Sequence, residues 1–171
     1  MSRIQKLHEN INTIFARVDE IPPVYKHLCG VSQLCVLLAV KRGENPELSA
    51  FSGMLHDIAY LASCDTVKYE NEPHKIQGIT GENHAERSAL LADKILAELG
   101  VTSETENEII ITAIRNHANK ERIDGPIDEI LKDADVFEHG LLSVSMQKTN
   151  FRGDRWDRVC REIGMDNCRK N

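Results

Sequence analysis

The stretch Met54-Leu55-His56-Asp57-Ile58-Ala59-Tyr60 places a histidine and an aspartate side by side in an otherwise apolar run. Leu55 and Ile58 are typical core residues, so the pattern predicts that the polar pair between them also lies towards the interior. Burying an unpaired charge costs roughly several kcal/mol, and a buried aspartate therefore requires a cation, a donor or a metal. The alternative interpretation is a solvent-facing pair at a helix end.

The composition is that of one globular domain. The chain has 171 residues, of which 41% are hydrophobic and 28% charged, which suffices for a single core. Its net charge of −6 at pH 7 argues against a protein that binds large nucleic acids through their phosphates. No apolar run is expected to reach the roughly 20 residues of a membrane span, and no secretory signal is recognised.

The five cysteines are odd in number and form no CxxC motif. This pattern indicates reduced thiols and a cytoplasmic protein. The charge and the hydropathy lead us to expect neither a large nucleic acid nor a membrane as a partner, and a homo-oligomer is compatible with the sequence.

Hydrophobic periodicity predicts helices and no strand, hence a single all-α bundle of about six to eight helices over residues 1–171. Ser103 with Glu106 forms a capping box, Gly100 ends the preceding helix, and Asp154 is expected to cap the last one. The predicted helices cover about residues 4–18, 23–38, 48–55, 84–99, 103–117, 126–135 with an extension over 141–146, and 154–163. Residues 61–83 are rich in turn signals and are predicted to form a lid loop.

Several histidines and aspartates fall where the helical period requires core residues. They are His27, His56, Asp57, His117 and Asp135, with His84 at the start of a further helix beside the predicted lid. Each alone has an ordinary explanation: a buried histidine can be satisfied by the core, and Asp135 can pair with Lys132. Together they would be costly to bury without a shared partner, and a metal is such a partner. Imidazole and carboxylate ligands without thiolate suit Mn, Fe, Zn, Ni or Co.

The order of His27, His56-Asp57 and Asp135 resembles the HD-domain superfamily of metal-dependent phosphohydrolases. The segment Ile130–Asp135 is similar to the family's "iLkdAD" segment, with Asp135 aligned to the family ligand and Asp133 expected beside the ligands or at the surface. The resemblance spans about residues 24–142 and leaves residues 143–171 as a C-terminal extension.

His84 and His117 resemble the two additional histidines of HD-GYP phosphodiesterases and of the di-iron oxygenase branch. The resemblance implies one ion held by His27, His56, Asp57 and Asp135, and a second held by Asp57, His84 and His117, with Asp57 as the bridge. The chain lacks the GYP tripeptide, so hydrolysis of cyclic di-GMP is not expected.

The resemblance implies that His56 and Asp57 are catalytic, because a metal-bound water with a pKa near ~7 would attack phosphorus. The predicted phosphate-binding residues are Arg87, Arg115, Lys120 and Arg122, for which the alternative is a solvated surface. Candidates for a general acid or base are Glu86, Asp65 and Glu138, among which the sequence does not choose. His139, four residues after Asp135, is a candidate donor behind the ligands.

We expect a phosphohydrolase that cleaves a phosphate ester or phosphoanhydride of a small metabolite, with a nucleotide favoured, using one or two divalent transition metals. Two alternatives stay open: an HD-type di-iron oxygenase, and a non-catalytic module that binds a nucleotide.

Overall fold

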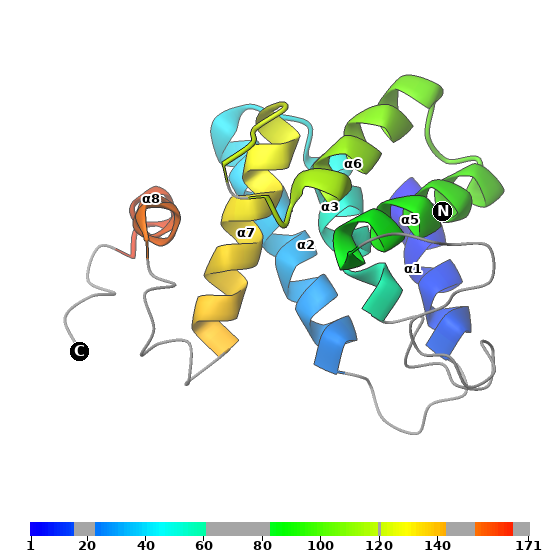
Figure 1. Cartoon of the computed structure of the whole chain (residues 1–171), viewed down its shortest axis with the longest axis horizontal. Coiled ribbons are helices and arrows are strands. Elements are labelled where there is room, and N and C mark those ends of the chain that lie inside the picture. Colours follow the sequence, from blue (N-terminus) through cyan, green and yellow to red (C-terminus); the bar gives the residue numbers. More distant parts are fainter. Residues whose placement is uncertain (16–22, 61–82, 120, 143–152, 166–171) are drawn as a thin grey trace.

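The computed structural model describes residues 1–15, 23–60, 83–119, 121–142 and 153–165. These residues form seven helices and no strand, which confirms the predicted all-α bundle (Figure 1). The helices are α1 (Arg3–Phe15), α2 (Pro23–Arg42), α3 (Pro46–Leu55), α5 (His84–Leu99), α6 (Glu104–Asn116), α7 (Pro126–Leu142) and α8 (Asp154–Ile163). The predicted lid over residues 61–83 lies outside the described residues, apart from Asn83.

Local capping chemistry sets the ends of several helices. The side chain of Asn45 accepts hydrogen bonds from the backbone of Glu47 and Leu48 at the start of α3. The Ser103–Glu106 capping box at the start of α6 is confirmed, and Gly100 ends α5 in the left-handed conformation with φ 59°. The prediction for α8 is wrong, because Asp154 is its first helical residue and the N-cap is Gly153, which has no side chain to bond.

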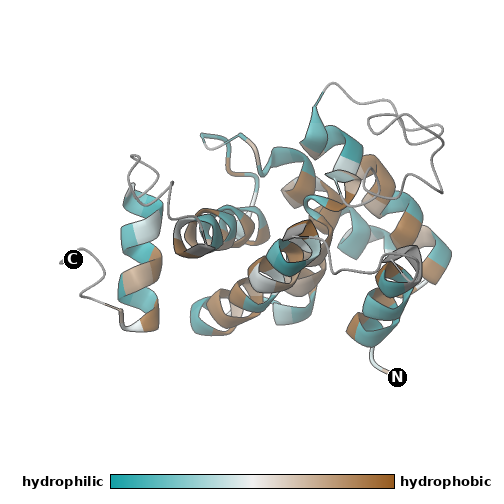
Figure 2. Cartoon of the chain, turned by 90° about the horizontal axis from the view of Figure 1, so that it is seen from below, coloured by the Kyte–Doolittle hydropathy of each residue, from teal (hydrophilic) through white to brown (hydrophobic). Residues whose placement is uncertain are grey.

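Helix α2 is the centre of the bundle and packs most extensively on α3 and α7 (Figure 1). Helix α5 packs on α6, which in turn contacts α3 and α7. Hydrophobic and hydrophilic residues lie on different faces of the helices (Figure 2), and the hydrophobic faces meet in one continuous core. The largest fully buried apolar side chains include Phe51, Phe137, Leu28, Leu38 and Met54.

One helix of the described chain is long and apolar enough to span a bilayer, contrary to the expectation from sequence. This is the segment Val24–Arg42 of α2. Core helices of soluble proteins meet the same criterion of length and composition, and α2 carries His27, the first predicted ligand, into the centre of the bundle.

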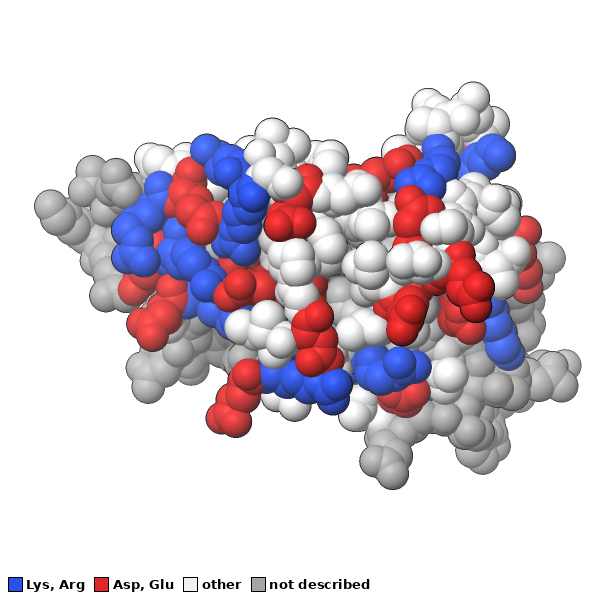
Figure 3. Space-filling view, turned by 90° about the horizontal axis from the view of Figure 1, so that it is seen from above, with Lys and Arg blue, Asp and Glu red and all other residues white. Residues whose placement is uncertain are grey.

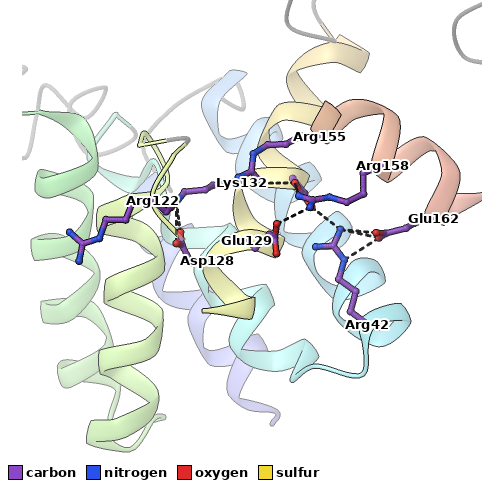
Figure 4. A network of polar contacts seen from close by, with 9 residues as sticks. Arg42, Arg122, Asp128, Glu129, Lys132, Arg155, Arg158 and Glu162 are labelled. Atoms are coloured by element: carbon purple, nitrogen blue, oxygen red, sulfur yellow. Dashed lines mark hydrogen bonds and ion pairs between the residues drawn. The ribbon is translucent and has the colours of Figure 1, made fainter. Parts of the chain in front are cut away.

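Asp133 is a buried polar link between α8 and the rest of the molecule. Its carboxylate is fully buried and accepts hydrogen bonds from Arg42 of α2 (2.7 Å) and from Arg155 (2.7 Å) and Arg158 of α8 (Figure 4). Arg42 also binds Glu162 and Arg158 also binds Glu129, so cationic and anionic groups interleave at this end of the molecule (Figure 3). Asp133 therefore joins three helices, and the expected position beside the ligands or at the surface is wrong.

Candidate metal centre

The six predicted ligands converge from five helices. His27 lies near the start of α2, His56 and His117 are the C-cap residues of α3 and α6, and Asp57 follows His56 directly. His84 opens α5, and Asp135 lies in the middle of α7. Because helix ends and one helix middle meet at this point, residues up to 108 positions apart in sequence become neighbours.

Three ligands form a close group on one side of the centre. The Nε2 atoms of His27 and His56 lie 3.1 Å apart. The Oδ1 atom of Asp135 lies 3.3 Å from Nε2 of His27 and 3.5 Å from Nε2 of His56. All three ligand atoms named here can therefore reach one ion after small adjustments.

Asp57 stands between this group and the remaining two histidines. Its Oδ2 atom lies 3.7 Å from Nε2 of His56 and 4.0 Å from Nε2 of His27. Its Oδ1 atom lies 3.5 Å from Nε2 of His117 and 3.8 Å from Nε2 of His84. The two oxygens of one carboxylate thus face two different pairs of histidines, which is the arrangement that a bridging ligand requires.

The other ring nitrogen of each buried histidine already has a partner. Nδ1 of His56 donates to the carbonyl of Gly53 (2.8 Å), and Nδ1 of His117 donates to the carbonyl of Ile114 (2.6 Å). Nδ1 of His27 donates to the carboxylate of Glu138. These bonds use Nδ1 of each ring and direct Nε2 into the centre, as in metal-bound histidines.

Buried oxygens without hydrogen-bond partners mark the same place. Oδ1 of Asp57 and Oδ1 of Asp135 are both buried and make no hydrogen bond among the described residues. Burial without a partner is costly for a carboxylate oxygen. Imidazole nitrogens and carboxylate oxygens in this arrangement fit a divalent transition metal, and the residues present therefore fit the ion that the sequence implied.

The electrostatics favour ionised carboxylates in the centre. Burial alone would raise the pKa of Asp135, but the neighbouring His27 and His56 hold it well below its ordinary value. Burial would likewise raise the pKa of Asp57, whereas His117 and His56 bring it below the ordinary value. Burial lowers the pKa of His84, which favours the neutral ring that coordinates a metal.

The centre has a closed back and an open side. The side chains of His56 and His117 are 0% and 4% exposed, whereas those of His84 and His139 are 30% and 38% exposed. The ring of Tyr60 stacks on that of His84, with centroids 5.3 Å apart. A substrate would therefore reach the centre most easily past His84, the predicted ligand with the most exposed side chain.

Three further polar residues near the centre have defined places. His139 lies with Nε2 at 3.3 Å from Oδ1 of Asp135, the same oxygen that faces His27 and His56, and its side chain is 38% exposed. Lys132, considered as a partner for Asp135, instead forms a buried ion pair with Asp128 at 2.9 Å. Glu138, considered as a general acid or base, is buried against His27.

Two of the predicted phosphate-binding cations form ion pairs with carboxylates of the chain. Arg115 pairs with Glu86 at 2.9 Å, and Arg122 pairs with Asp124 at 2.7 Å. Arg87 lies in the first turn of α5 and is one of the charges that lower the pKa of His84, which places it near the open side. Lys120 lies outside the described residues.

A cavity of about 530 Å³ lies away from the centre, between the starts of α3 and α7 and the middle of α6. Its walls include Leu48, Ile109 and Ile127 and none of the six predicted ligands. The chemistry described above is therefore not located in this cavity.

Comparison with known proteins agrees with the geometry. The model of the HD domain family matches residues 24–140, which is more than half of the chain and includes all six predicted ligands. The chain belongs to the HD domain family. This HD domain is 33% identical over 106 residues to a Bacillus subtilis (strain 168) protein named "Putative phosphohydrolase YueE". The match covers 59% of this chain and 57% of the relative, less than two thirds of its length. No solved structure matches the chain.

Proposed function

We propose that this HD domain is a metal-dependent phosphohydrolase that cleaves a phosphate ester or phosphoanhydride of a small metabolite, with nucleotides as the first class to test. The observation that carries the proposal is Asp57, whose two oxygens face separate histidine pairs within 4.0 Å. The name of the Bacillus subtilis relative supports the same reaction class. The net charge of −6 supports a small substrate over a large nucleic acid.

A divalent metal bound there supplies a water with a pKa lowered to ~7 and a positive charge for phosphate oxygens. The residues of the chain supply the rest. Asp57 and Asp135 balance the charge of the ions, and His27, His56, His84 and His117 complete the two sets of ligands. Arg87, in the first turn of α5, acts electrostatically on His84, which supports it as a candidate contact for a phosphate oxygen.

The test is a phosphate-release assay on protein purified without chelator and analysed for metal. Nucleoside mono- and triphosphates and an aryl phosphate are compared with Mn, Ni, Co, Zn and Fe. We expect release of phosphate or pyrophosphate from at least one nucleotide, and its loss in Asp57→Ala. Glu129→Gln, a change on α7 whose carboxylate pairs with Arg158, should retain the activity.

His84 and His117 both lie near Oδ1 of Asp57. Because two ions can share that carboxylate, this arrangement also favours a second candidate, a di-iron oxygenase. Iron content with consumption of O₂ during turnover would support it, whereas phosphate release under anaerobic conditions with Mn or Ni would exclude it. A metal-loaded protein that binds nucleotides but releases no phosphate and consumes no O₂ would indicate a non-catalytic module.

A further inference from the structure

Glu138 is a buried carboxylate directly behind a predicted ligand. It lies on α7, three residues after Asp135, and only 4% of its surface is exposed. Its Oε2 atom accepts the hydrogen bond from Nδ1 of His27, on the ring side opposite the nitrogen that faces Asp135. Glu138 and Asp135 therefore contact the two nitrogens of the same imidazole from one helix.

The central helix provides room for this carboxylate. Gly30 lies three residues after His27, on the same face of α2. A Cβ atom at Gly30 would lie 3.1 Å from Cγ and 3.2 Å from Oε1 of Glu138, which is tighter than ordinary packing. Glycine destabilises the interior of a helix. Its presence at position 30 indicates that the side chain of Glu138 occupies the space that a larger residue would fill.

His27 differs in this respect from the two other buried histidines. Nδ1 of His56 and Nδ1 of His117 each bond a carbonyl of the helix that precedes them. A carboxylate partner makes an imidazole a stronger ligand than a carbonyl partner does, and it also fixes the ring tautomer. The carboxylate partner therefore strengthens His27, and with it the set of ligands that His27 forms with His56 and Asp135.

We propose that Glu138 is a positioning residue that holds His27 in the tautomer with a free Nε2, so that the His27–His56–Asp135 site binds a divalent metal more tightly than the site of His84 and His117. This inference rests on the metal centre of the proposed function, and its tests measure metal binding and not turnover. Glu138 acts through His27, since Glu138 reaches Nδ1 and not the face of the ring that points into the centre. The two sites are then filled in order, first the one that Glu138 supports.

The experiment is a calorimetric titration of chelator-stripped protein with Mn²⁺, and with Co²⁺ for its visible absorption. In Glu138→Gln, which keeps the size and loses the charge, we expect affinity at the tighter site to fall about 10–100-fold, with the weaker site unchanged. Gly30→Ala should displace Glu138 and weaken the same site while leaving the carboxylate in the sequence. Glu129→Gln, on the same helix, serves as the matched control and should bind as the wild type does.

A double-mutant cycle with His27→Ala separates positioning from general stability. If Glu138 acts through His27, Glu138→Gln should have no further effect on metal affinity in the His27→Ala background. Wild-type affinity at both sites in Glu138→Gln, or an equal loss at both sites, would overturn the proposal. Wild-type protein that binds no metal would instead refute the metal centre itself, and metal binding without phosphate release would refute only the phosphohydrolase. Thermal unfolding of each variant checks that it is folded.

Discussion

The Nε2 atoms of His27 and His56 lie 3.1 Å apart, although the Nδ1 atom of each ring is already committed to another partner. Two neutral rings with protons on Nδ1 would direct their Nε2 lone pairs at one another. A cation between the rings relieves this conflict, whether it is a proton in the metal-free protein or a metal ion. The contact therefore fits a cation site built from α2 and α3.

Removal of a ligand next to this contact should abolish metal binding. His56→Ala removes a nitrogen from the tighter site, and Asp57→Ala removes an oxygen from both sites. We expect metal analysis to show loss of stoichiometric metal in both variants and loss of the stabilisation that metal gives, about 2.7 kcal/mol at a hundredfold excess over Kd. Stoichiometric metal retained in both variants would refute the assigned centre.

The second set of ligands makes a separate prediction about stoichiometry. His84→Ala removes the exposed ligand opposite Asp57 and leaves the His27–His56–Asp135 group intact. Metal content should fall from two ions to one per chain, measured by elemental analysis after gel filtration. An unchanged content would indicate a single-metal centre.

The metal-free protein should lose stability in alkaline solution. Burial would lower the pKa of His27, but its bonds to Asp135 and Glu138 outweigh burial and raise the pKa to about 10. Because the folded state holds this proton more tightly than the unfolded state, in which the pKa is about 6.5, the stabilisation is complete below that pH. It is lost as the pH rises towards about 10.

Urea unfolding of chelator-stripped protein at pH 6, 8 and 10 measures this dependence. The fall in the free energy of unfolding should be smaller in His27→Ala than in the wild type. The added stability from metal should grow over the same interval, because metal and proton compete for Nε2 of His27. Equal slopes for the variant and the wild type would contradict the assignment.

The buried carboxylate of Asp133 should govern stability without affecting metal stoichiometry. Asp133→Ala leaves three arginine side chains without their shared partner, and breaking such a buried pair costs about 3–5 kcal/mol. This is a large part of the roughly 5–15 kcal/mol that stabilises a typical domain. Asp154→Ala, an exposed change in the first turn of α8, is the control. A thermal midpoint equal to that of the wild type in Asp133→Ala would refute the role of this link.

The sequence alone determined the helices and the identity of the predicted ligands, because both depend on short-range patterns. The capping box of Ser103 and Glu106 and the stop at Gly100 involve bonds between residues three or four apart, so the order of residues reveals them. The spacing of apolar residues likewise placed His27 and Asp135 on inward faces. Asp154 was misassigned because a capping residue and a first-turn acid look alike in sequence.

Only the tertiary structure decided which partners the polar side chains have. The two oxygens of Asp57 point to different histidine pairs, Glu138 lies against a histidine 111 residues away, and Asp133 gathers arginines from two other helices. Asp133 and Asp135 are two residues apart, and the sequence placed Asp135 on an inward face but did not reveal the arginine partners of Asp133. Their side chains leave α7 in different directions, and the helices packed on each side give one of them three guanidinium groups and the other the imidazoles of the metal centre.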